Sequence, residues 1–132
     1  MSSKRSICII DDDKVYTFGI KKIINNHLPG NTVTTFENGK LALDQLREMK
    51  AEDEAMPDVI LLDIDMPEMN GWDFLKEFEA IRKSIAKKVE IFVISSRIES
   101  NNESLYQIEW DDKVSKFMPK PVDIERLKEI FN

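Results

Sequence analysis

Residues 58–75 read DVILLDIDMPEMNGWDFL. Within them, Val59–Leu62 is apolar at every position, Asp63 and Asp65 follow it, and an Asn-Gly pair precedes a second apolar segment. A strand with one face in water alternates apolar and polar residues, whereas a strand covered on both faces is apolar throughout. Asn-Gly pairs interrupt regular structure. These residues therefore predict a buried strand, then a polar loop, then a helix.

The same alternation extends along the whole chain. The candidate strands are Ser6–Ile10, Thr32–Phe36, Asp58–Leu62, Val89–Ile94 and Val114–Met118. Five other segments carry apolar residues at helical spacing; their members are Val15, Phe18, Ile23 and Ile24, then Ala42, Leu43, Leu46 and Met49, then Phe74, Leu75, Phe78, Ile81 and Ile85, then Leu105 and Ile108, and last Ile124, Leu127, Ile130 and Phe131. Regular strand–helix alternation predicts an α/β domain, a doubly wound parallel five-stranded sheet with helices on both faces.

Turn residues and polarity place several boundaries. Pro29-Gly30-Asn31 ends the first helix, and Asn38-Gly39 introduces the second. The second strand is the most polar of the five, so we expect it at an edge of the sheet. The segment Arg47–Met56 is highly charged, and we expect it to form a loop.

Length and composition exclude several classes of protein. The 132 residues suffice for one domain, and 42% hydrophobic with 33% charged residues indicates a folded globular one. The net charge of −6 argues against general binding to DNA or RNA. No apolar run approaches the roughly 20 residues of a membrane-spanning helix. Cys8 has no second cysteine to pair with. We expect one acidic intracellular domain over residues 1–132, with no output domain.

The residues that follow the predicted strands carry the chemistry, because ligands of an open parallel sheet bind at the carboxyl ends of its strands. Acids follow the first and third strands, and a hydroxyl and an ammonium group follow the fourth and fifth; these residues are Asp11, Asp12, Asp13, Asp63, Asp65, Ser95 and Lys120. Carboxylates from neighbouring strands repel one another unless a cation binds them. Oxygen ligands without a His or Cys cluster favour Mg²⁺, and such a site suits a phosphoryl group that one aspartate accepts as a nucleophile.

Each of these residues also has a simpler structural interpretation. An aspartate after a strand is more often a helix cap or a turn residue than a nucleophile, and for Asp13 we retain that interpretation. Ser95 alone is compatible with a turn at a strand end, and Phe117 packs in the core in any case. The prediction of a site depends on the whole ordered set.

That ordered set closely resembles the receiver domain of bacterial response regulators. The resemblance covers Ile7 to Phe131 and rests on IIDDD (9–13), LLDIDMPEMNGWDFL (61–75), VISS (93–96) and FMPKP (117–121). It implies the flavodoxin-like, CheY-like (βα)5 fold with strand order 2-1-3-4-5. It also implies a cytoplasmic signalling switch of a two-component system or phosphorelay, which is not an enzyme beyond its own phosphorylation and dephosphorylation.

The resemblance assigns the acids individually. Asp63 matches the phosphoacceptor. Asp12 would bind Mg²⁺ directly, together with Asp63 and the backbone carbonyl of Asp65. Asp11 would act on the metal mainly through a bound water.

A second group of matching residues responds to the phosphoryl group. Ser95 matches the hydroxyl that moves to meet the phosphoryl oxygens, and Lys120 matches the ammonium group that binds them. Phe117 matches an aromatic residue whose rotamer follows that hydroxyl and so changes the surface of the fourth helix, fifth strand and fifth helix. Asp65 and Arg97 occupy positions that tune the phosphoryl lifetime in the family. A cis peptide bond is implied between Lys120 and the following proline.

The resemblance also implies partners. The phosphoryl donor would be a sensor histidine kinase or a histidine phosphotransfer protein, because the only histidine here, His27, is expected on the surface near a helix end. The output would be contact with a downstream protein or onward phosphotransfer.

Two other functions use similar residues. A Mg²⁺-dependent phosphohydrolase of the haloacid dehalogenase type would also use Asp63 as a nucleophile, within an Asp-x-Asp motif. In that family the motif comes first in the chain and the acid pair last, which is the reverse of the order here. A flavin-binding domain of similar topology needs a phosphate loop rich in Ser, Thr or Gly after the first strand, where this chain has three aspartates.

Overall fold

The computed structural model describes residues 5–49, 55–95, 110, 113–120 and 122–131. Their elements, in chain order, are β1 (Ser6–Ile10), α1 (Lys14–His27), β2 (Thr32–Phe36), α2 (Gly39–Met49), β3 (Val59–Asp63), α3 (Gly71–Lys83), β4 (Glu90–Ser95), β5 (Lys116–Pro119) and α5 (Ile124–Phe131). The helix expected around Leu105 and Ile108 lies outside the described residues. The predicted strands are all present, with the last three shifted by one or two residues.

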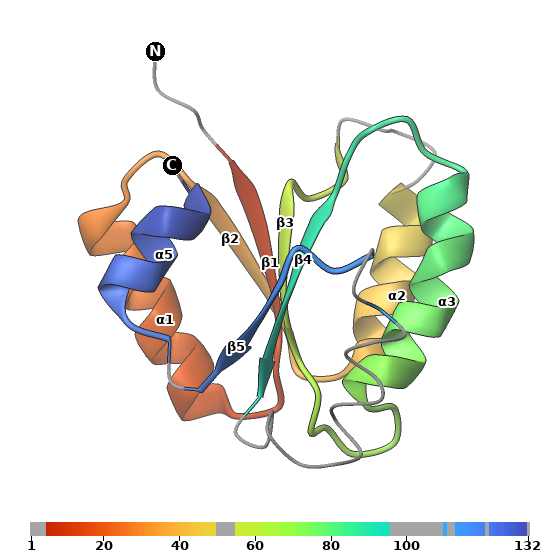
Figure 1. The fold of residues 1–132 in the computed structure, drawn as a ribbon, viewed down its shortest axis with the longest axis horizontal. Helices are drawn as coiled ribbons and strands as arrows, with labels where there is room; N and C mark the ends of the chain where they lie inside the picture. The colour runs from red at the N-terminus through yellow and green to blue at the C-terminus, as the bar shows by residue number, and fades with distance from the viewer. Residues whose placement is uncertain (1–4, 50–54, 96–109, 111–112, 121, 132) are drawn as a thin grey trace.

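The strands form one parallel sheet in the order β2-β1-β3-β4-β5 (Figure 1). This is the CheY-like, flavodoxin-like arrangement, so the predicted fold class is confirmed. All five residues of β3 are buried, and the apolar run Val59–Leu62 predicted this for the first four. β2 lies at the edge and leaves most of its residues exposed, as its polarity predicted.

Helices cover both faces of the sheet, with α1 and α5 on one side and α2 and α3 on the other (Figure 1). Ile10, Leu62 and Phe74 belong to one apolar core, and Ile24 and Leu127 belong to the other. Among the described helices, none has the length and apolar character that spanning a membrane requires. With both faces of the sheet covered by apolar side chains, the polar groups that could do chemistry gather at the strand ends.

The apolar face of α1 differs from the prediction. Thr17, Ile20 and Ile24 are buried, whereas Val15 and Phe18 are 83% and 67% exposed. At about 100° per residue, one helix cannot turn both sets toward the sheet. The branched side chains of Ile20 and Ile24 fill the core against β1 and β3, and Val15 and Phe18 remain in solvent.

The first residues of the segment Arg47–Met56, which was expected to form a loop, are helical. Helix α2 continues through Arg47 to Met49, since Ala42, Leu43 and Leu46 bury one face of it. Burial of an amphipathic face stabilises a helix more than local charge disfavours it.

Candidate functional site

The topology brings the ends of four strands together. β1 and β3 are neighbours, with Ile10 opposite Leu62, so Asp11 comes to lie beside Asp63. β4 and β5 are also paired, with Ser95 opposite Pro119, and Lys120 follows directly. The residues expected at one edge of the sheet are therefore found there together.

The loop that carries Asp63 is fixed by the start of α3. The Asn70 side chain caps this helix by accepting a hydrogen bond from the Asp73 N–H at 2.9 Å. A Cβ on Gly71 would lie 2.7 Å from the Asp63 carbonyl oxygen and 2.9 Å from the Ile64 Cα. Only glycine allows α3 to begin this close to the end of β3.

Three carboxylates form one cluster at this edge. Asp11, Asp12 and Asp63 each place an oxygen within 4.8 Å of the others. Asp11 and Asp63 are only 4% and 3% exposed, whereas Asp12 is exposed to solvent. Carboxylate oxygens are the ligands of hard divalent cations such as Mg²⁺. The cluster could hold a metal ion.

Lys120 supplies the positive charge on this cluster. Its Nζ lies 2.9 Å from Asp11 Oδ2 and 3.9 Å from Asp63 Oδ2, and its side chain is 17% exposed. The backbone N–H of Lys120 donates to the Ser95 carbonyl oxygen at 3.1 Å. Asp11 also accepts a hydrogen bond from the Asp13 N–H at 2.9 Å. Asp13 itself caps α1 by accepting from the Tyr16 N–H, as predicted.

The single positive charge of Lys120 does not neutralise the two buried acids, Asp11 and Asp63. Burial raises the pKa of Asp63 to about 7, and the charge of Asp11 adds to the effect, while Lys120 opposes it. Burial also raises the pKa of Asp11, despite hydrogen bonds from the Asp13 N–H and Lys120. For Lys120, burial lowers the pKa, but the hydrogen bond to Asp11 and the charges of both acids outweigh it, and the net pKa is raised. Another cation would relieve this repulsion.

Ser95 and Asp65 face each other across the site. Ser95 is fully buried, and its Oγ donates a hydrogen bond to Asp65 Oδ2 at 3.3 Å. The N–H of Asp65 in turn lies 3.3 Å from Asp63 Oδ1. Asp65 thus links the Ser95 hydroxyl to the predicted acceptor Asp63 through two hydrogen bonds.

Phe117 lies in β5 and is partly buried against the larger core. Its ring centroid is 6.2 Å from that of the buried Trp72. Its core packing was predicted. Arg97 and the expected cis bond before residue 121 lie outside the described residues.

One residue at this edge was not predicted from sequence. Tyr16, in the first turn of α1, places its ring under Lys120 Nζ at 4.4 Å from the centroid. The signal that could have identified it is its position: Asp13 caps α1 beside the acid cluster, so the first helical turn must pass close to the site.

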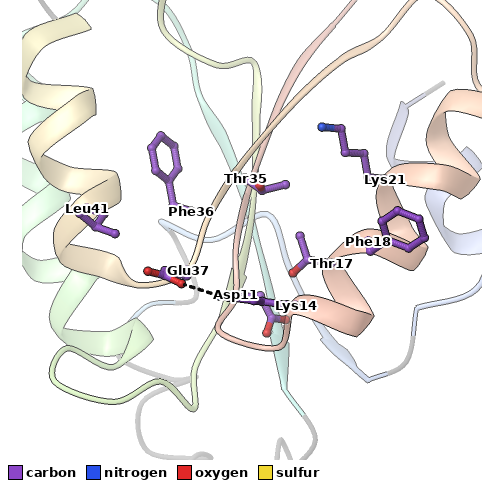
Figure 2. Close-up of a pocket in the computed structure, with 9 residues that line it drawn as sticks. All are labelled: Asp11, Lys14, Thr17, Phe18, Lys21, Thr35, Phe36, Glu37 and Leu41. Atoms are coloured by element: carbon purple, nitrogen blue, oxygen red, sulfur yellow. Dashed lines mark ion pairs between the residues drawn. The ribbon is translucent and has the colours of Figure 1, made fainter.

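A hollow lies on the β2 side of Asp11, between α1 and α2 (Figure 2). Its volume is about 460 Å³, and its walls include Phe18 and Leu41. Lys14 and Glu37, which both line it, form an ion pair of 3.6 Å (Figure 2). The lining also includes Asp11 and Lys21, so acids and lysines balance and the hollow has no net charge to select an ion.

Comparisons with known proteins agree on one family. The model of the response regulator receiver domain matches residues 7–132. A protein-glutamate methylesterase/protein-glutamine glutaminase of Treponema pallidum is 35% identical over 92 residues, which are 69% of this chain and 20% of that protein. The transcriptional regulatory protein YdfI of Bacillus subtilis is 34% identical over 55% of this chain and 32% of its own length. This chain spans only about a fifth to a third of these relatives.

Solved structures show the same fold. A CheY-like receiver domain protein of Methanospirillum hungatei superposes with a TM-score of 0.72 at 25% identity, covering 96% of this chain and 90% of that one. The chemotaxis protein CheY4 of Vibrio cholerae gives a TM-score of 0.73 at 22% identity, covering 97% and 96%. Together with the family match, these likenesses show that the chain belongs to the response regulator receiver domains, the phosphoacceptor switches of two-component signalling.

Proposed function

We propose that Asp63 is the residue that accepts the phosphoryl group, from a phosphohistidine on a sensor histidine kinase or a histidine phosphotransfer protein. The observation that carries this proposal is the position of its carboxylate. It is buried at the end of the central strand, within 4.8 Å of oxygens from Asp11 and Asp12, and 3.9 Å from Lys120 Nζ. Of the two buried acids of the cluster, Asp11 binds the Lys120 ammonium group at 2.9 Å, whereas Asp63 lies 3.9 Å from it.

The transfer step forms one bond and breaks one. An oxygen of the Asp63 carboxylate attacks phosphorus, and the phosphorus–nitrogen bond of the donor breaks with its electron pair going to the imidazole nitrogen. The product is an acyl phosphate on Asp63. Lys120 is close enough to turn its ammonium group to a phosphoryl oxygen, and it balances charge that forms there.

The residues that would hold Mg²⁺ are Asp12, Asp63 and the backbone carbonyl of Asp65, with Asp11 acting through a water molecule. The donor set fits because it is made of oxygens, and because buried acids without enough positive charge have raised pKa values. Bound there, Mg²⁺ would supply positive charge that keeps Asp63 ionised and shields the incoming phosphoryl group.

Two residues, Ser95 and Phe117, would then transmit the effect of phosphorylation to the protein surface. The phosphoryl oxygens compete with Asp65 for the Ser95 hydroxyl, and Phe117, next to the core on β5, follows the movement of Ser95. Asp65 therefore bears on the phosphoryl lifetime, as does Arg97. The changed surface of β5 and α5 provides output by protein contact or onward phosphotransfer, with residues 1–132 acting as a single cytoplasmic receiver unit rather than as an enzyme with its own substrate.

A haloacid dehalogenase-type phosphohydrolase is not favoured. The family model of the receiver domain matches almost the whole chain. In addition, the acid pair comes before the Asp-x-Asp motif along the chain, which is the reverse of the order in the hydrolase family. Rapid turnover of a phosphate monoester would restore that alternative.

The test is intact-mass spectrometry after incubation with acetyl phosphate and Mg²⁺. We expect the wild type to gain the mass of one phosphoryl group and the Asp63→Asn variant to gain none. Asp73→Asn is the matched control, because it removes an exposed carboxylate ten residues further along and should label like the wild type. Equal labelling of the Asp63→Asn variant and the wild type would disprove the assignment.

A further inference from the structure

Within the described part of the chain, Tyr16 supplies the one aromatic ring that contacts the lysine of the site. It stands in the first turn of α1, and Lys120 Nζ lies over its ring face, 4.4 Å from the centroid. At this distance an ammonium group is attracted to the negative face of the ring. Lys120 is thus held by a carboxylate on one side and by a ring on the other.

The ring is itself fixed at its far end. The Tyr16 hydroxyl accepts a hydrogen bond from the Val122 N–H at 3.4 Å, two residues beyond Lys120. The side chain therefore bridges α1 and the segment that carries the lysine. A change in the angle of the ring would therefore move the ring face that the Lys120 ammonium group contacts.

Tyr16 also lines a small cavity beside the two buried acids. Asp11, Asp63, Tyr16 and Val122 border a cavity of only about 10 Å³, which is no more than one water molecule occupies. The contacts of the Lys120 ammonium group with the ring face and with Asp11 restrict its movement away from the two buried acids. A lysine side chain has many rotamers, and ordering it in advance lowers the entropy that binding a phosphoryl oxygen costs.

We propose that Tyr16 is a positioning residue for phosphoryl transfer: its ring holds the Lys120 ammonium group at the acid cluster, ready to bind a phosphoryl oxygen. This inference rests on the proposed function of Asp63 and Lys120. The role belongs to the ring face, and the hydroxyl only steadies the ring.

The test compares two variants. Tyr16→Phe keeps the ring and removes the hydroxyl, whereas Tyr16→Met keeps an apolar side chain of similar length and removes the ring. We measure the rate of phosphorylation by acetyl phosphate at saturating Mg²⁺. Tyr16→Phe should stay within about twofold of the wild type, and Tyr16→Met should be about fivefold slower, the size of effect that a partly exposed cation–π contact supplies.

A spectroscopic measurement makes the test independent of the reaction. In the wild type and in Tyr16→Phe, the ring current should shift the NMR signals of the Lys120 Cε protons upfield, and in Tyr16→Met this shift should vanish. Circular dichroism establishes that each variant is folded; should Tyr16→Met be unfolded, Tyr16→Leu takes its place.

Three outcomes would overturn the inference. They are equal slowing of Tyr16→Phe and Tyr16→Met, a folded ring-less variant with the wild-type rate, and a wild-type Lys120 without the upfield shift. Failure of the proposed function looks different: the wild type itself would not be labelled, or Asp63→Asn would be labelled equally.

Discussion

Replacing Asp63 by asparagine should stabilise the metal-free protein, by an amount that depends on pH. The pKa of Asp63 rises from an ordinary 3.8 to about 7, because the carboxyl group is buried and lies beside Asp11. Between these pH values the folded chain holds a proton that the unfolded chain has lost. The free energy of unfolding of the wild type therefore falls as the pH rises through this window. Asparagine is neutral at every pH, so the free energy of unfolding of the variant does not fall in this way.

The size of the gain follows from the pKa difference. About three pH units at 1.36 kcal/mol per unit correspond to roughly 4 kcal/mol above pH 7. Asp63 is only 3% exposed, so solvent screens little of this penalty. We expect the Asp63→Asn variant to be more stable than the wild type by about 3–4 kcal/mol at pH 8, and by less than about 1 kcal/mol at pH 4.

The assay is urea unfolding in the presence of a chelator, followed by the fluorescence of Trp72 and Trp110, both of which are buried. Glu48→Gln is the control, since it removes an exposed carboxylate from α2 and should change stability by less than about 0.5 kcal/mol at any pH. Excess Mg²⁺ should reduce the gain, because only the wild type has the complete acid cluster to bind the ion. Equal stability of the Asp63→Asn variant and the wild type at pH 8 without metal would show that ionised Asp63 does not destabilise the fold.

Three further predictions concern the fold around the site. Gly71→Ala should lower the free energy of unfolding by about 2–3 kcal/mol in a urea titration, because the new Cβ meets the Asp63 carbonyl oxygen at 2.7 Å; an unchanged midpoint would contradict the close contact. Asn70→Ala should cost about 1 kcal/mol in the same assay through loss of the α3 cap, and Asn70→Asp, which keeps an acceptor, should recover most of it. Burial raises the pKa of Cys8 to about 12, so iodoacetamide at pH 8 should label it only after unfolding; rapid labelling of the native protein would show that β1 is not buried as described.

The fold was predictable because its signals are redundant. The fully apolar β3, the polar β2 and the Asn-Gly pairs before α2 and α3 each agree with the observed topology. The gathering of Asp11, Asp63 and Lys120 at one edge was also predictable, since parallel strands end on the same side. The chemical roles of these residues remain predictions.

Other features depend on packing that a sequence pattern does not contain. The pattern of α1 shows apolar residues on two faces, and only the neighbouring sheet decides that Ile20 and Ile24 face inward while Val15 and Phe18 face solvent. Tyr16 was missed for a similar reason. Its partner lies more than a hundred residues away, and the contact depends on how α1 is placed against the end of β5.

The most direct test of the central claim, that one acid cluster holds both a metal ion and the phosphoryl group, is a crystal structure with Mg²⁺ and beryllofluoride, which mimics a phosphoryl group. We expect beryllium bonded to a carboxylate oxygen of Asp63, Mg²⁺ held by Asp12 and Asp63, and Lys120 turned from Asp11 to the fluorides. A beryllofluoride bound elsewhere, or a site that remains empty with Lys120 still paired to Asp11, would contradict it.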